Sequence, residues 1–478
     1  MSAVASAIKR TVSQGVMKVA AFNRNRLEVP SKPHPFLTGI HAPLTKELTA
    51  EALTVQGVIP PELDGRYVRI GPNPVKPPNP AAYHWFTGDG MVHGVRLKAG
   101  KALWYRNRWV RSIAVSAALN EDAAPGPRHG IGDTVNTNVL GHAGKIWALV
   151  EAGGYPVELD ENLMTVSHNN FEGTLRGSFT AHPHRDPDTG ELHAVTYDAR
   201  ELNTIHHVVI GIDGKARREE PITVRHGPSI HDCALTKQYV LLFDLPVTFS
   251  MKTLLAGHPF PYAWNPKHNA RVGLLPREGK DADIIWCNVD PCYVFHPCNA
   301  YETDDGKVIV DVVAHDTMFA ESVAGPDSHK TTFERWTIDA GTKEVTRKVI
   351  DAARQEFPRP DERRYGKPYR YAYATPLARE DDTFLSDSHI IRHDLHTGTR
   401  IEHRFAAGQY PGEFVFVPRS ATSAEDDGWL MGYVVNLAAQ TTDLVILNAK
   451  DFSGPPQAVI TIPQRIPAGF HGNWIPGH

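Results

Sequence analysis

Cysteine is scarce in this chain, with four residues among 478, and all four fall in one stretch of the middle: Cys233, Cys287, Cys292 and Cys298. None of their spacings is CxxC, which excludes a zinc ribbon. A low cysteine count without a disulfide framework suits a reducing compartment, so we expect a cytoplasmic protein. The four thiols are predicted to be free and buried.

Long apolar runs are also missing, because no window approaches the roughly 18 consecutive apolar residues of a spanning helix. The first 30 residues lack a compact apolar core followed by a small-residue cleavage site, so they do not form a secretory signal. Read as a helix, they form a weak basic amphipathic segment that either touches a membrane surface, docks on its own domain or frays. Its apolar face would contain Val4, Ile8, Val12, Val16 and Val19, with Lys9, Arg10 and Lys18 elsewhere.

No excess of positive charge is present either. The formal net charge is -4 and the sequence pI is about 6.7, so nucleic acid is not an expected partner. The hydrophobic share of 41% and charged share of 22% are ordinary for a folded soluble protein.

What the chain does have is many short β-like segments, rich in Val, Ile and aromatic residues. Turn sequences separate them, such as Pro-Asp-Thr-Gly at 187–190 and Asp-Gly at 213–214 and 305–306. The 37 prolines and 38 glycines are spread evenly, which argues against long helices. The predicted strands lie at 67–71, 145–150, 193–198, 206–212, 239–245, 307–314, 414–418, 432–437 and 443–449.

This pattern favours one large, closed all-β architecture. The length would also allow about two or three average domains, but no composition shift marks an internal boundary. We therefore expect an N-terminal segment, residues 1–30, and a single domain over residues 31–478. A β-propeller is the natural candidate, because radial repetition leaves only short protected edges. No repeat of fixed period is visible, so periodicity alone does not establish it.

Four of the 25 histidines stand in settings that suggest metal binding. Their separations of 49, 65 and 175 residues exclude local motifs such as HExxH and suit ligands from different blades. Spacing alone leaves rivals open, namely His184, His226 and His315. The four are His182 in FTAHPHRDPDTGEL, His231 in HGPSIHDCALT, His296 in CYVFHPCNAYE and His471 in AGFHGNWIP.

At these residues the chain resembles the carotenoid cleavage oxygenase family, which includes stilbene-cleaving oxygenases and the retinal isomerohydrolase of the visual cycle. Bacterial carotenoid-cleaving members look most similar. The resemblance runs over nearly the whole chain. Its landmarks are GRYVRIGPNP (65–74), HWFTGDGMVHGVRL (84–97), YRNRWVR (105–111), NTNV (136–139), AHPHRDPDTGEL (181–192), SIHDCALT (229–236), VFHPCNAYE (294–302), EFPRPDERRYGKPYRYAYAT (356–375), GEFVFVP (412–418) and FHGNW (470–474).

The resemblance implies a seven-bladed β-propeller with a cap of loops and helices over an iron site on the axis. It implies one iron(II) per chain, held by His182, His231, His296 and His471, with dioxygen as co-substrate and no organic redox cofactor. It also places three glutamates, Glu151, Glu356 and Glu413, beside the last three of these histidines, where they would fix the imidazole rings. His182 is left without such a partner.

The implied reaction is cleavage of a carbon–carbon double bond in a carotenoid or apocarotenoid, giving aldehyde or ketone products. Stilbene-cleaving relatives instead have a lysine before the first glutamate and a tyrosine about thirty residues upstream. Here that position is Val150, and the region around Leu119 and Asn120 offers no tyrosine. We therefore favour a polyene in an apolar tunnel lined by Val150 and Phe86, with stilbene cleavage as the alternative.

Two further questions stay open at this point. The scaffold could also serve a polyene isomerase or a non-catalytic carotenoid binder, because a fold alone does not assign a reaction. The segment 249–264, FSMKTLLAGHPFPYAW, occupies the place of a cap segment that dips into membranes in the family. We expect it to expose Met251, Leu254, Leu255, Phe260 and Trp264 for peripheral membrane contact, unless it packs against the propeller rim. No obligate protein partner is expected.

Overall fold

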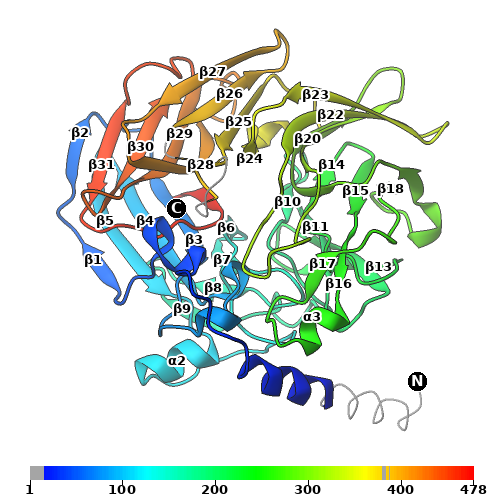
Figure 1. Ribbon diagram of the computed structural model, residues 1–478. Coiled ribbons are helices and arrows are strands. Elements are labelled where there is room, and N and C mark those ends of the chain that lie inside the picture. Colours follow the sequence, from blue (N-terminus) through cyan, green and yellow to red (C-terminus); the bar gives the residue numbers. More distant parts are fainter. Residues whose placement is uncertain (1–14, 379–383, 387, 478) are drawn as a thin grey trace.

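A computed structural model describes residues 15–378, 384–386 and 388–477 of the chain. Within these ranges the strands form seven sheets of four or five strands, plus one two-stranded sheet. The seven sheets stand around a common centre as the blades of a propeller (Figure 1). The prediction of an all-β, seven-bladed propeller is confirmed, and all nine predicted strand segments lie on strands.

Each blade is a small antiparallel sheet, and one of its two edge strands lies nearest the centre. Blades 1 to 4 contain, from inside outward, β32 (Gly472–Pro476), β3 (Gly65–Pro72), β4 (Gly90–Lys98), β5 (Lys101–Trp109) and β1 (Leu48–Ala50); β6 (Asn138–His142), β7 (Lys145–Leu149), β8 (Val157–Leu159) and β9 (Thr165–His168); β10 (His184–Arg185), β11 (Leu192–Tyr197), β12 (Thr204–Ile210) and β13 (Ala216–Thr223); and β14 (Cys233–Leu235), β15 (Tyr239–Asp244), β18 (Arg271–Pro276) and β19 (Ile285–Asn288).

Blades 5 to 7 complete the ring. They contain β20 (Tyr293–Glu302), β21 (Val308–His315), β22 (Thr331–Asp339) and β23 (Glu344–Asp351); β24 (Gln355–Arg359), β25 (Tyr371–Pro376), β26 (His389–Asp394) and β27 (Thr399–Arg404); and β28 (Gln409–Pro418), β29 (Gly428–Asn436), β30 (Thr441–Asn448), β31 (Ala458–Ile462) and β2 (Thr54–Gly57).

Strands from both ends of the described chain close the ring. The late strand β32 pairs with β3 and forms the inner edge of blade 1, and the early strand β2 pairs with β31 at the outer edge of blade 7. The innermost strands touch their neighbours around the centre, since β32 contacts both β28 and β6. Hydrophobic cores between and within the blades hold this arrangement, and each strand alternates side chains between two packed faces.

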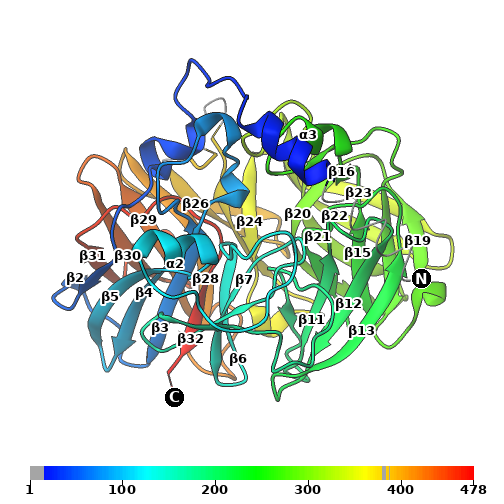
Figure 2. The same cartoon turned by 90° about the horizontal axis from the view of Figure 1, so that it is seen from below.

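A cap covers one face of the propeller (Figure 2). It includes the helical residues 15–24, helix α3 (Met251–Leu255) and the hairpin of β16 (Val247–Phe249) and β17 (Tyr262–Trp264), which leaves blade 4 between β15 and β18. The cap helix at 15–24 docks on this excursion, because Asn23 donates to the carbonyl of Leu255. A further helix, α2 (Ile113–Leu119), follows β5. The first 14 residues of the predicted amphipathic segment lie outside the described residues.

Two smaller expectations have clear outcomes. The four cysteines are free and buried, as predicted from their number and spacing. In the part of the chain that the structure describes, no helix is long and apolar enough to span a membrane.

Candidate metal centre

Four histidines meet at the centre of the ring, one from each of four blades. His182 and His231 each lie two residues before the short innermost strand of blades 3 and 4, and His471 directly precedes that of blade 1. His296 lies within β20 of blade 5. All four are buried, and one ring nitrogen of each lies within 4.8 Å of the others. Residues up to 289 positions apart thus converge because the innermost strands of a propeller share one axis.

The other three blades supply a glutamate each. Glu151 follows β7 of blade 2, Glu356 lies in β24 of blade 6 and Glu413 in β28 of blade 7. Each carboxylate lies beside the Nδ1 atom of one histidine. The distances are 2.9 Å from Glu151 Oε1 to His231, 2.6 Å from Glu356 Oε2 to His296 and 3.0 Å from Glu413 Oε1 to His471.

This pairing determines where the imidazole lone pairs face. A carboxylate beside Nδ1 favours the tautomer with its proton on Nδ1, which leaves Nε2 as a lone-pair donor. The Nε2 atoms of His231 and His296 lie 3.2 Å apart. The Nε2 atom of His182 is buried and has no hydrogen-bond partner among the described residues. A group of inward lone pairs without protons is the donor set that a divalent transition metal requires.

The electrostatics favour a neutral His182 ring and an ionised Glu413. Burial, reinforced by the neighbouring rings of His231 and His471, lowers the pKa of His182 well below its ordinary value, so its ring is neutral. Burial alone would raise the pKa of Glu413, but the Arg359 guanidinium and the His471 ring outweigh it and lower that pKa to about 2. The glutamate therefore stays ionised beside its histidine at neutral pH.

Sequence reasoning missed the groups that hold the glutamates. The Tyr197 hydroxyl donates to Glu151 Oε2 at 2.8 Å, and Arg359 donates from Nη1 to Glu413 Oε1 at 3.2 Å. His315, a rival ligand in the sequence, lies instead with Nε2 3.0 Å from Glu356 Oε1. None of these contacts had a sequence signal beyond the presence of Arg359 within the landmark segment 356–375.

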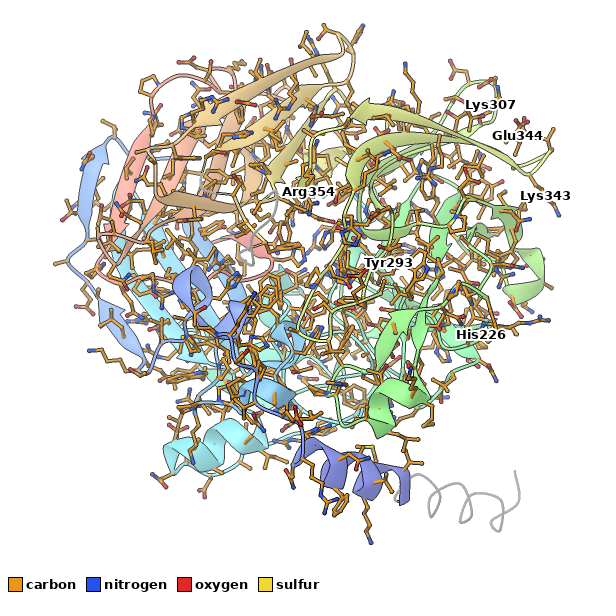
Figure 3. The ribbon with its side chains drawn as sticks, in the orientation of Figure 1. His226, Tyr293, Lys307, Lys343, Glu344 and Arg354 are labelled. Atoms are coloured by element: carbon orange, nitrogen blue, oxygen red, sulfur yellow. The ribbon has the colours of Figure 1, made fainter. Side chains whose placement is uncertain are left out.

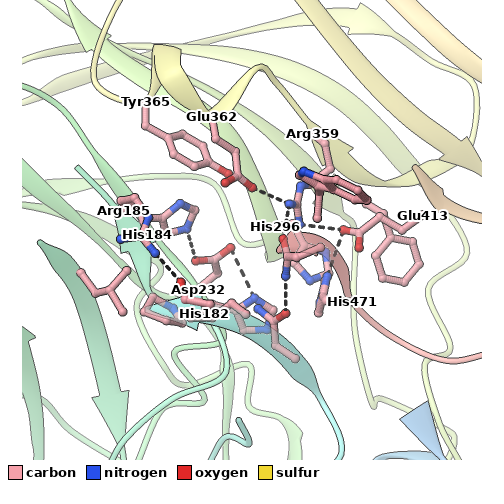
Figure 4. A pocket seen from close by; sticks show the side chains of 18 of the residues that line it. His182, His184, Arg185, Asp232, His296, Arg359, Glu362, Tyr365, Glu413 and His471 are labelled. Atoms are coloured by element: carbon pink, nitrogen blue, oxygen red, sulfur yellow. Dashed lines mark hydrogen bonds and ion pairs between the residues drawn. The ribbon is translucent and has the colours of Figure 1, made fainter. Parts of the chain in front are cut away.

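A fourth carboxylate lies beside His182, the ring that the resemblance left without one. Asp232 Oδ2 is 3.8 Å from His182 Nδ1, and Asp232 Oδ1 is 2.7 Å from Nε2 of His184 (Figure 4). The backbone N–H of Cys233 also donates to Asp232 Oδ1. The carboxylate of Asp232 therefore separates His184, the second rival ligand, from the cluster.

The third rival, His226, lies far from the centre. Figure 3 shows it at the outer edge of blade 4, away from Tyr293 near the axis. Its Nδ1 atom is 3.1 Å from Nδ1 of His268, which in turn pairs with Asp244. His226 therefore has no geometric access to the four-histidine cluster.

Two kinds of cavity reach the cluster from opposite sides. On the cap side, an aromatic pocket lined by Phe86, Phe295 and Phe470 touches His231, His296 and His471. A cavity of about 310 Å³ beneath the cap shares Phe86 and Glu151 with this pocket and also contains Val150. Both residues predicted to line the substrate tunnel thus lie on it. On the opposite side, a polar cavity of about 320 Å³ reaches His182, His296 and His471 (Figure 4).

The segment 249–264 was predicted to expose five apolar residues, and this prediction is wrong for four of them. Met251 is 45% exposed, but Leu254 is only 7% exposed, and Leu255, Phe260 and Trp264 are partly buried. The reason is the cavity beneath them, because Leu254 and Phe260 turn inward and line it. Phe260 also stacks on the His84 ring at 4.3 Å.

Comparison with known proteins identifies the group to which this architecture belongs. The family model described as retinal pigment epithelial membrane protein matches residues 41–476. A protein named carotenoid cleavage oxygenase from Mycobacterium tuberculosis is 43% identical, over 93% of this chain and 98% of the relative. The chain belongs to the carotenoid cleavage oxygenase family. It is accordingly an oxygenase.

Solved structures of this family share the fold over almost its full length. A cobalt-substituted apocarotenoid oxygenase from Synechocystis is similar with a TM-score of 0.80 and 27% identity, over 91% of this chain and 97% of that one. The lignostilbene dioxygenase of Pseudomonas brassicacearum gives a TM-score of 0.83 at 27% identity, over 94% and 100% of the two chains. A metal ion is bound by a family member, and this oxygenase has a buried four-histidine cluster with the donors for one.

Proposed function

We propose that this oxygenase is a non-haem iron(II) dioxygenase that cleaves a carbon–carbon double bond of a carotenoid or apocarotenoid, giving aldehyde or ketone products. The observation that carries this proposal is the convergence of four buried imidazole nitrogens, three of them on rings that line the inner end of an aromatic cavity. At such a site a bound metal ion and a bound apolar substrate would lie next to each other.

In this proposal His182, His231, His296 and His471 hold one iron(II) ion. Imidazole suits this metal, and four neutral ligands leave its positive charge undiminished. Glu151, Glu356 and Glu413 orient three of the rings through Nδ1, and their negative charge raises the basicity of the ligands. When bound, the iron supplies the activation of dioxygen, and the electron-rich alkene supplies electrons.

The cap-side cavity binds the substrate by burial. Phe86 is surrounded by Phe260, Phe295, Phe319 and Phe470 at ring-centroid distances of 5.4–6.0 Å. An aromatic wall of this kind contacts a conjugated chain along its length and excludes water from it. Burying a polyene here contributes about 25 cal/mol for each Å² of apolar surface removed from water.

Stilbene cleavage is the second candidate, favoured by the fold shared with a lignostilbene dioxygenase. It would require a partner for the phenol hydroxyl near Glu151. Val150 offers none, and the nearby Tyr197 hydroxyl already donates to Glu151. An unpaired buried hydroxyl costs about 1–3 kcal/mol, which disfavours this substrate class roughly ten- to hundred-fold.

The test is a comparison of kcat/KM with one iron-loaded preparation. The panel contains carotenoids, apocarotenals and 4-hydroxystilbenes, and products are identified by mass. We expect faster turnover of one of the polyenes, with dialdehyde or aldehyde products that require oxygen. A higher kcat/KM for the hydroxystilbenes would move the enzyme to the second candidate, and an isomerised polyene of unchanged mass would overturn both.

We also propose peripheral membrane contact through the cap, where an apolar substrate would enter. Met251 of α3 is exposed, and the adjoining helical residues expose Met17, Val19 and Phe22. Arg24, which donates to the carbonyl of Gly257, lines the cavity under them. Co-sedimentation with phosphatidylcholine vesicles should fall when Met251 and Phe22 are changed together to Glu. Equal binding by the variant and the wild type would remove this surface from consideration.

A further inference from the structure

The polar cavity in Figure 4 opens on the face of the propeller opposite the cap. Its outer part is formed by the ends of β6 and β32, which lie on the lower face in Figure 2, whereas α3 lies on the upper face. Gly141 and the exposed Pro476 mark this outer end. At its inner end three of the four clustered histidines form the wall.

The two sides of the cluster differ in what they can admit. A hydrated divalent cation exchanges its waters for oxygen and nitrogen donors, so it passes poorly between apolar side chains. The cap-side pocket against the cluster is aromatic and has only about 30 Å³ of free space. The opposite cavity has about 320 Å³ and a polar lining, in which Arg359 pairs with Glu362 and Glu413 and the Asp232 carboxylate faces His184.

One pair of side chains in this cavity has the composition of an outer cation site. His184 Nε2 and Asp232 Oδ1 lie 2.7 Å apart, and together with the Cys233 sulfur they form a second group of potential ligand atoms within 4.8 Å. The Cys233 side chain is fully buried in the hydrophobic core and does not line the cavity, whereas His184 and Asp232 do. An imidazole and a carboxylate remain, which bind a first-row divalent ion while leaving most of its waters in place.

The position of this pair links it to the centre. Asp232 Oδ2 lies 3.8 Å from His182 Nδ1, so the same carboxylate faces both the outer imidazole and a histidine of the cluster. An ion held by His184 and Asp232 would therefore lie next to His182, one of the four histidines. Together these four offer the ion more ligand atoms than the outer pair does.

We propose that this polar cavity is the path by which a divalent metal ion reaches the four-histidine cluster, and that His184 and Asp232 form a transient outer site that captures the ion. The path rests on the proposed metal centre. It separates metal loading from substrate entry, because the ion and the polyene approach the cluster from opposite faces.

The test measures metal uptake by the full-length chain prepared without metal. Cobalt(II) is added in a stopped-flow instrument, and its ligand-field absorption reports binding independently of turnover. His184→Gln removes a ligand of the outer site and leaves the four histidines intact. We expect it to slow uptake about tenfold or more, with the same final stoichiometry, as the removal of a metal-binding group requires.

A charge exchange at the mouth tests the path without touching any ligand. Pro476→Glu should speed uptake and Pro476→Lys should slow it, by about two- to tenfold at low ionic strength, and the difference should vanish at high salt. The matched control is Ile131, which is 58% exposed and lines the cap-side cavity. Ile131→Glu and Ile131→Lys should leave the uptake rate unchanged.

The outcomes separate the path from the centre. A wild-type chain that binds no cobalt, or a His296→Ala chain that binds it equally well, overturns the metal centre and the path with it. A wild-type chain that binds one ion, with uptake that responds to charge at Ile131 and not at Pro476, overturns the path alone. Unchanged uptake in His184→Gln removes the outer site.

Discussion

The Nε2 atoms of His231 and His296 lie 3.2 Å apart, while the Nδ1 atom of each ring lies against a glutamate. With both protons drawn to Nδ1, two lone pairs face each other, an arrangement that a cation between the rings stabilises. This contact fits the proposal that both histidines are ligands of a common ion.

Replacing any one of His182, His231, His296 or His471 by Ala should remove most bound iron and abolish turnover, because the cluster loses a ligand and gains a void. Iron content of the purified chain is measured by atomic absorption. His226→Ala is the matched control, since this histidine lies at the edge of blade 4, and it should retain its iron. Normal iron content in His231→Ala contradicts the ligand set.

Glu356→Gln should weaken metal binding without abolishing it, by about 10–100-fold in affinity. The amide keeps the shape of the side chain but loses the charge that faces both His296 and His315. Competition titration of cobalt(II) against a chelator gives the affinity of the variant and the wild type. Identical affinities would show that Glu356 does not orient His296.

Val150→Lys should lower kcat/KM for polyenes, because an ammonium group in the cap-side cavity must be desolvated or must expose the cavity to water. Iron content should stay normal, since Val150 lines the cap-side cavity and is not among the four histidines and three glutamates of the cluster. Val150→Leu keeps the lining apolar and serves as the control. An equal kcat/KM for polyenes in Val150→Lys and the wild type would show that the substrate binds away from Val150.

We expect an acid-dependent loss of stability from His193, which lies in blade 3 opposite His184 on the neighbouring strand. Burial, followed by the charge of Arg277, lowers the pKa of His193 to about 4. The unfolded chain has a histidine pKa of about 6.5, so below that pH the unfolded state takes up the proton first. Above about pH 6.5, His193 therefore does not change the free energy of unfolding. By about pH 4 it lowers that free energy by roughly 2–4 kcal/mol.

Urea unfolding of wild type and His193→Gln between pH 7.5 and 4.5 measures this contribution. The variant should unfold more easily at pH 7.5, where it weakens the contact with His207, but lose less stability on acidification. Parallel stability curves over the whole range would show that His193 does not carry the acid sensitivity.

Strand content was readable from the sequence because each blade strand is a short run of β-branched and aromatic residues ended by a turn. The number of blades was not. The repeat is blurred by unequal insertions, such as the hairpin and helix α3 between β15 and β18, which lengthen blade 4. The seven-bladed fold came instead from the resemblance to a family.

The roles of the four histidines and three glutamates likewise came from the resemblance, and the structure brings these seven residues together. Asp232 escaped notice because an aspartate after His231 in sequence gives no indication that it faces His182 and His184 of the preceding blade. Leu254 was placed on the surface because an apolar stretch in sequence does not reveal a cavity beneath it. Contacts between blades depend on ring closure, which local patterns do not encode.

The strand that closes the ring also sets the moment at which the centre can form during synthesis. β32 supplies the inner edge of blade 1, and His471 directly precedes it. Before His471 and β32 have been synthesised, the nascent chain contains only three of the four histidines, and the ring of blades is still open. Since chains emerge from the N-terminal end, iron capture should wait for closure, and a chain interrupted before residue 471 should be an apo-protein rather than a half-active oxygenase.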